Sequence, residues 1–187
     1  MNVTIQPNRN ITTSRANQQA DEILFGLADP VWCRIAAFQF APLVERLQLK
    51  EGLSLDQAQQ AFDDAKQFLY LCGRRRPDGS QPMVPPEPID MAWHHFILFT
   101  DAYTEFCDRH IGRYVHHRPF TQAERAANRA DGAGLKGLKA SIAFAKDVFG
   151  TLSDNWCEHL LTSKTGSTGG TVIEECSGST NCQAPYR

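Results

Sequence analysis

Five of the six histidines in this 187-residue sequence lie between residues 90 and 119, together with one of its six cysteines. Imidazole and thiolate are common zinc ligands, and a thiol beside an imidazole is also a frequent arrangement for nucleophilic catalysis. A third explanation is a tightly packed helix pair, in which the histidines only cap carbonyl groups or face water. This segment is therefore the first place to look for function.

The spacing of these residues favours a metal site. Asp90 and His94 are four residues apart and share a helix face, so the carboxylate can orient the imidazole or bind a metal beside it. Cys107 supplies a thiolate. His116 and His117 lie in an extended stretch and point to opposite sides, so one of them reaches a shared centre. The predicted ligands are Asp90, His94, Cys107 and one of His116 and His117. The expected metal is zinc, which prefers four ligands drawn from Cys, His and carboxylate.

A shared site requires the chain to fold back between its ligands. In one straight helix, the 13-residue separation of His94 and Cys107 would span about 20 Å at 1.5 Å per residue. Thr100 lies near the midpoint and is a residue type that can cap a new helix. The sequence therefore predicts two short antiparallel helices, over about 89–99 and 101–111, that meet at Thr100.

Between Asp90 and Pro119 the chain carries the pattern D-x-x-W-H-x-F-I-L-x-T-x-x-Y-x-x-F-C, followed by G and then H-H-x-P. This pattern resembles the signature of the glycine-rich-domain-containing-protein-like family, in its small bacterial form. His95 and His110 fall at positions that the pattern leaves open, and the short tail of this chain is only modestly glycine-rich. The resemblance implies a special role for one His, one Cys and a His pair, which strengthens the metal-binding interpretation. The residues at matching positions are Asp90, Trp93, His94, Phe96, Ile97, Leu98, Thr100, Tyr103, Phe106, Cys107, Gly112, His116, His117 and Pro119.

Three functions are compatible with this cluster. Four protein ligands would close the site and brace a binding or scaffold module. Three ligands and a water would leave an open position for a metal-dependent enzyme, with Glu105 or His95 as base. In a thiol enzyme Cys107 would be the nucleophile, a nearby His the base and Asp90 the orienting group. The metal-binding module is the favoured prediction, and whether the protein is an enzyme stays open.

The remaining sequence predicts an all-α protein that positions this segment. We expect a single-domain irregular helical bundle with a His/Cys-bearing helical hairpin and a flexible C-terminal tail. The predicted parts are a flexible N-terminal tail over 1–13, a helical domain over 14–161, and a Gly/Ser/Thr-rich tail over 162–187 with two cysteines. Convincing strand alternation is absent from the sequence except in the short stretch TVIEE.

Capping signals divide the helical domain into elements. The pairs Ser54–Gln57 and Thr121–Glu124 both have the spacing of a capping box, in which each side chain bonds to the other residue's backbone amide. Prolines that suit a first helical turn and glycines that suit a helix end mark the other boundaries. The expected starts are Ser14, Pro30, Pro42 and Ser153, and the expected ends are Gly52 and Gly73.

Composition sets limits on location and partners. The N-terminal residues lack the apolar run of a secretory signal, and no uncharged apolar stretch approaches the roughly 18 residues of a membrane helix. We therefore expect a cytoplasmic protein with reduced cysteines and no membrane partner. Residues 109–146 carry eight Lys or Arg against two Asp or Glu. This surface is either a solvated helix face or a site for an anionic partner such as RNA or an acidic protein.

Overall fold

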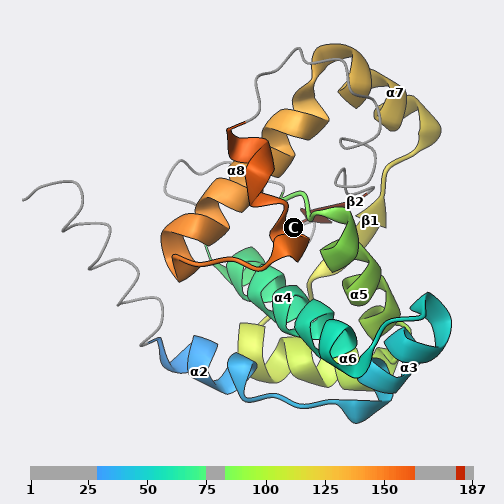
Figure 1. Cartoon of the computed structure of the whole chain (residues 1–187), viewed down its shortest axis with the longest axis vertical. Helices are drawn as coiled ribbons and strands as arrows, with labels where there is room; N and C mark the ends of the chain where they lie inside the picture. The colour runs from blue at the N-terminus through green and yellow to red at the C-terminus, as the bar shows by residue number, and fades with distance from the viewer. Residues whose placement is uncertain (1–28, 75–82, 163–179, 184–187) are drawn as a thin grey trace, which may run out of the picture.

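The computed structural model describes residues 29–74, 83–162 and 180–183. Within these ranges the chain is predominantly helical, which confirms the all-α prediction (Figure 1). The body of the helix predicted from Ser14 and the TVIEE stretch lie outside the described residues. In the described part of the chain, no helix is both long enough and apolar enough to cross a membrane.

Helices dominate the order of elements along the chain. The elements are α2 (Pro30–Ala36), α3 (Ala41–Glu51), α4 (Leu55–Gly73), α5 (Glu87–Ile97), α6 (Thr100–Phe106), the π-helical turn η1 (Cys107–Ile111), β1 (His116–Pro119), α7 (Gln122–Asp131), α8 (Ala133–Phe149), the 3₁₀ turns η2 (Asp154–Trp156) and η3 (Glu158–Leu161), and β2 (Thr180–Gln183).

Helix α4 is the centre of the bundle. It packs against α2, α3, α5 and α8, and Figure 1 shows it crossing the molecule between them. Its first turn is held by the predicted capping box of Ser54 and Gln57. Phe62, Phe68 and Leu69 on its apolar face are fully buried, and burial of each such side chain stabilises the fold by about 1.5–3 kcal/mol.

A buried lysine joins α4 to the connection between α2 and α3. Lys66 is almost fully buried, and its Nζ donates to the carbonyl oxygens of Ala36 and Phe38, each at 3.0 Å. The Asp63 carboxylate lies 2.8 Å from the same Nζ. The buried cation thus has three partners, and it supplies hydrogen bonds to carbonyl groups at the end of α2 and just after it.

The predicted break in the histidine-rich segment is confirmed. α5 ends at Ile97 and α6 begins at Thr100. Phe99 between them has a non-helical backbone (φ −90°, ψ 67°) and makes no side-chain cap. Its ring packs edge-on against Phe40 with centroids 5.1 Å apart. Tertiary packing of an aromatic side chain therefore accompanies the break, rather than the hydroxyl cap that the sequence suggested at Thr100.

A short two-stranded sheet follows the hairpin. β1 pairs antiparallel with β2, with His116 opposite Gln183 and His117 opposite Cys182. The sequence predicted the extended conformation of β1 but gave it no partner. Four residues of the segment expected to be a flexible tail thus form the second strand.

The end of the helical domain differs from the single short helix expected after Ser153. The Ser153 hydroxyl makes no cap and donates instead to Asp64 at 2.7 Å. Cys157 has a left-handed backbone (φ 53°) between η2 and η3, which divides the stretch into two 3₁₀ turns. Cys157 is also disulfide-bonded, so the expectation of reduced cysteines is wrong for this residue.

Candidate functional site

Three of the predicted ligands meet where α5 faces β1. The Oδ1 atom of Asp90 lies 3.2 Å from Nε2 of His117, and the two side chains are only 8% and 7% exposed. The His117 ring packs edge-on against Trp93 with centroids 4.6 Å apart. The ring of His94, an exposed residue, lies 5.3 Å from that of His117. Asp90, His94 and His117 thus form one cluster, in which the side chains of Asp90 and His117 are buried and His94 is exposed.

Cys107 lies in the core and does not join this cluster. It is fully buried at the end of α6, where its thiol neighbours Tyr103. The Tyr103 hydroxyl accepts from Trp93 Nε1 at 3.0 Å and donates to the Val115 carbonyl at 2.6 Å. Burial raises the pKa of Tyr103 far above its ordinary value, so this hydroxyl stays protonated and available as a donor.

His116 lies on the opposite side of β1 from its neighbour, as the alternation of an extended strand requires. It is exposed, and its ring lies 4.8 Å from that of Tyr114. Across residues 29–74, 83–162 and 180–183, no group of three or more His, Cys, Asp or Glu side chains is placed to hold a metal ion. The predicted four-ligand centre with Cys107 is therefore not formed.

The residues predicted as bases have other partners. Arg46 Nε donates to Nδ1 of His95 at 2.9 Å, and Nε2 of His95 lies 2.6 Å from Oε1 of Glu51. Glu105 is exposed and pairs with Arg109 at 2.5 Å on the same helical surface. His95 thus organises the side chain of Glu51, and Glu105 belongs to a solvated ion pair.

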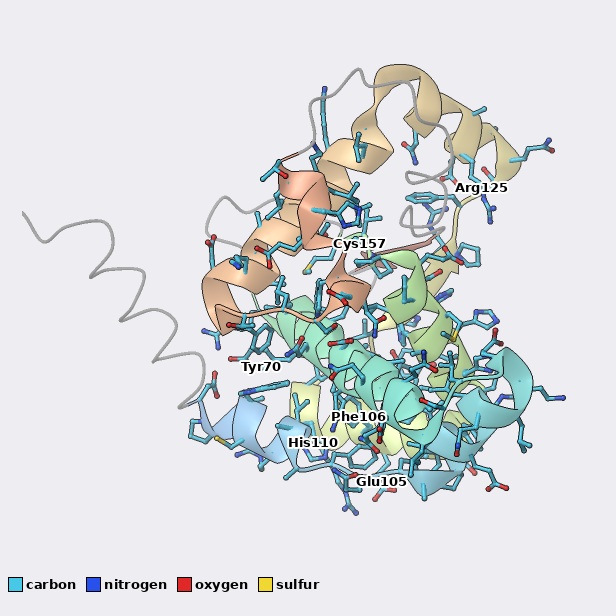
Figure 2. The ribbon with its side chains drawn as sticks, in the orientation of Figure 1. Tyr70, Glu105, Phe106, His110, Arg125 and Cys157 are labelled. Atoms are coloured by element: carbon cyan, nitrogen blue, oxygen red, sulfur yellow. The ribbon has the colours of Figure 1, made fainter. Side chains whose placement is uncertain are left out.

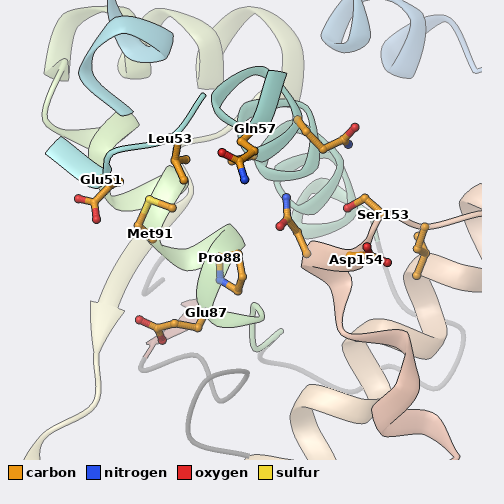
Figure 3. A pocket seen from close by; sticks show the side chains of 12 residues that line it. Glu51, Leu53, Gln57, Glu87, Pro88, Met91, Ser153 and Asp154 are labelled. Carbon is orange, nitrogen blue, oxygen red and sulfur yellow. The ribbon is translucent and has the colours of Figure 1, made fainter. Parts of the chain in front are cut away.

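A cavity of about 890 Å³ lies beside the same helix, α5. Its lining comes from three stretches that are far apart in the sequence: the end of α3 with the start of α4, the start of α5, and the turn before η2 with the first residues of η2. In the view of Figure 3, Glu51 and Glu87 lie at one side of the opening and Asp154 at the other. The lining residues are Glu51, Leu53, Gln57, Gln60, Ala61, Glu87, Pro88, Met91, Leu152, Ser153, Asp154 and Asn155.

Two carboxyl groups in and under this cavity have raised pKa values. Burial raises the pKa of Glu87, and the nearby Asp90 charge adds to this effect while Arg125 opposes it. Burial also raises the pKa of Asp64, although it accepts hydrogen bonds from Ser153 and from Asn155, the latter at 2.8 Å. Asp64 thus fixes two of the lining residues in place.

Sequence reasoning missed this cavity because no local spacing marks it. Its polar residues come from segments that meet only after α4, α5 and the turn before η2 have packed together. The raised pKa of Glu87 likewise depends on burial that the sequence does not reveal.

Ion pairs occupy part of the basic segment 109–146. Arg118 lies 2.9 Å from Glu124, and Lys146 lies 2.6 Å from Glu158. These contacts neutralise some of its positive charge. An anionic partner for this surface stays a prediction.

Comparison with protein-family models matches residues 33–149 to the UCP032817-like family, an uncharacterised family. No curated protein and no solved structure matches the chain. The resemblance to the glycine-rich-domain family was therefore wrong. Trp93, Phe96, Tyr103 and Phe106, which carried much of it, are buried packing residues, and such aromatic positions suit many helical hairpins. From within α2 to the end of α8, this chain belongs to the UCP032817-like family.

Proposed function

We propose that this protein is a binding module for a small cationic ligand, which occupies the 890 Å³ cavity beside α5. This proposal rests on the negative charge of the residues that line the cavity. Glu51, Glu87 and Asp154 supply three carboxyl groups, and the described lining residues include no Lys or Arg. A primary or secondary ammonium group is the complementary ligand chemistry, since charge-assisted hydrogen bonds to carboxylates are the strong ones.

The rest of the lining indicates what the ligand carries besides its charge. Leu53, Met91 and Leu152 provide apolar surface, and Gln57 and Asn155 provide amide donors and acceptors. The volume falls in the range of about 300–1,000 Å³ that small-molecule sites have. An amine with an apolar body and one or two further polar groups fits this combination.

Glu51 has the most organised environment of the three carboxyl groups. His95 contacts it at 2.6 Å and is in turn held by Arg46. A carboxylate whose orientation is held by a hydrogen bond loses less conformational freedom on binding than one that rotates freely. Glu51 is therefore the carboxylate expected to bind the ammonium group directly. Glu87 and Asp154 add negative charge to the same cavity.

Calorimetric titration with spermidine and phenethylamine tests the proposal, with phenylethanol as the uncharged analogue. We expect saturable binding of at least one amine and none of phenylethanol. Glu87→Gln or Asp154→Asn should weaken binding roughly tenfold, as expected for loss of one hydrogen bond to a charged group. Because an ammonium group favours the ionised form of Glu87, affinity should fall as the pH is lowered through its raised pKa.

Glu105→Gln is the matched control, since Glu105 is an exposed carboxylate outside the cavity. Its affinity should equal that of the wild type. Equal binding of phenethylamine and phenylethanol, or unchanged affinity in both cavity variants, would exclude a cation site.

Divalent metal binding is the second candidate function. Asp90, His94 and His117 lie near one another, although as placed they do not form a metal site. The Asp90–His117 contact of 3.2 Å and the neighbouring His94 ring gather two imidazoles and a carboxylate. We infer that rotation of the exposed His94 ring would complete a three-ligand zinc site, which leaves the fourth position to water. Cys107 takes no part in this proposal because it is buried in the core.

Zinc titration separates this site from the original four-ligand prediction. His94→Ala should abolish stoichiometric binding, whereas Cys107→Ala and His116→Ala should retain it. If Cys107→Ala abolishes binding in a protein that is still folded, or if the wild type binds no zinc, the three-residue site is excluded.

A further inference from the structure

A second, smaller cavity lies at the other end of α4. It has a volume of about 170 Å³ and is enclosed by α2, the last turn of α4 and the π-helical turn η1. Figure 2 labels Tyr70 and His110, which line it, on the side of the molecule where α2 lies. Its other polar lining residues are Asp29 and Arg74. Single π-helical turns are rare and occur frequently at functional sites.

The imidazole of His110, one of the lining residues, has a ring nitrogen without a hydrogen bond to any described residue. Its Nδ1 is buried, and within the described part of the chain it has no hydrogen-bond partner. The ring is held in place by Phe38 and Phe106, with centroid distances of 5.7 and 5.2 Å. A buried polar atom without a partner is costly unless it serves a ligand or an ordered water.

The charged groups around His110 are mainly positive. Arg34 of α2 and Arg109 of η1 both act on its charge. Arg74, the residue after α4, lines the same cavity and pairs with Asp29. The one carboxylate in the lining, Asp29, is already bonded on three sides. It accepts from the Val31 amide at 2.7 Å, from Tyr70 at 2.9 Å and from Arg74 at 2.6 Å. The Asp29 carboxylate is thus already satisfied by hydrogen bonds within the protein.

We propose that this cavity binds a small oxyanion, a carboxylate- or phosphate-type group, through the imidazole of His110 and the guanidinium of Arg74. An imidazole N–H and a guanidinium fork are donors that match oxyanion oxygens. The lining of this cavity shares no residue with the lining of the larger cavity. The inference is therefore independent of the proposed cation site.

Binding should depend on pH in a defined direction. Burial, together with Arg34 and Arg109, lowers the pKa of His110 below its ordinary value of 6.5, so the ring is neutral near pH 7. The other titratable groups that line the cavity are Asp29, Tyr70 and Arg74, which are hydrogen-bonded to one another. A bound anion favours the imidazolium, so affinity should rise as the pH falls from about 8 to 5.

Sulfate is the main probe, because it does not titrate in this range, and acetate is the planar alternative. NMR titration of the full chain should show a saturable shift of the His110 ring resonances and a rise in the His110 pKa with sulfate or acetate. His110→Phe keeps an aromatic ring between Phe38 and Phe106 but removes the donor, and it should weaken binding at least about tenfold. Arg109→Gln, which alters a nearby charge outside the lining, should reduce affinity far less.

Two results would overturn this assignment. One is the absence of any saturable His110 shift with both anions, and the other is an affinity that His110→Phe leaves unchanged. The wild-type pH profile keeps the test decisive if the variant does not fold, because anion binding that is independent of pH would also exclude His110 as the donor.

Discussion

The carboxylate of Glu124 serves two neighbours at the start of α7. It accepts hydrogen bonds from both terminal nitrogens of Arg118, at 3.2 and 2.9 Å, and from the Thr121 amide at 2.8 Å. The Arg118 hydrogen bonds, followed by those of Thr121, lower the pKa of Glu124 to about 2. A folded-state value below the ordinary 4.5 means that this contact stabilises the fold above pH 4.5 and is lost as the pH falls toward 2.

Arg118→Gln should raise the pKa of Glu124 toward 4.5, because it removes the largest cause of the shift. Carbon NMR titration of the side-chain carboxyl groups measures this directly. Lys146→Gln is the control, since Lys146 contacts Glu158 instead, and it should leave Glu124 unchanged. A Glu124 value near 2 in Arg118→Gln would show that the capping box alone sets the pKa.

Single residues also show what the sequence could predict. The two capping boxes were predictable because residues three apart in the chain determine them. The contact of Asp90 with His117 was only partly predictable, since spacing left either His116 or His117 as the partner. The link of His95 to Arg46 and Glu51 was not predictable, because it joins α3 to α5 across more than forty residues.

At the scale of the elements, Tyr103 connects three parts of the histidine-rich segment. Tyr103 lies on α6. Its hydroxyl accepts a hydrogen bond from the indole of Trp93 on α5 and donates one to the carbonyl of Val115 just before β1. The break between α5 and α6 could be predicted, but the face of α6 that turns inward could not. That face carries Tyr103, Phe106 and Cys107 into the core, which is why the predicted ligand Cys107 is separated from His94.

Tyr103→Phe should destabilise the protein by about 1–3 kcal/mol, because the buried Val115 carbonyl and Trp93 indole each lose a partner. Urea unfolding measures the loss. Tyr114→Phe is the matched control: its ring packs edge-on against Tyr103 at 5.2 Å, and the change preserves that packing. A loss within about 0.5 kcal/mol for Tyr103→Phe would mean that water replaces the hydroxyl.

For the molecule as a whole, the helical fold followed from apolar periodicity and capping, which act locally. Strand β2 did not follow, since its pairing with β1 joins segments far apart in the sequence. The disulfide at Cys157 did not follow either, because no local pattern marks it. The expectation of reduced cysteines rested on the absence of a secretory signal, which carries no information on the pairing of a particular thiol. Cys33, Cys72 and Cys107 form no disulfide.

Cys157→Ser should lower the stability of the non-reduced protein by roughly 2–4 kcal/mol, the usual contribution of a disulfide. A reducing agent should lower the melting temperature of the wild type to that of the variant and leave the variant unchanged. Cys33→Ser, which replaces an exposed thiol, should behave as the wild type in both conditions. Identical melting of the wild type with and without reductant would contradict a stabilising bond at Cys157.

The pairing of β1 with β2 has a consequence for synthesis of the chain. The strand that carries His116 and His117 leaves the ribosome well before residues 180–183, which supply its partner. While the residues between them are being made, the backbone of β1 is an open strand edge, and such edges can pair with strands of other nascent chains. Arg118 and Pro119 at the end of this strand are residue types that oppose such pairing. They therefore disfavour association of nascent chains through β1 until β2 has been synthesised.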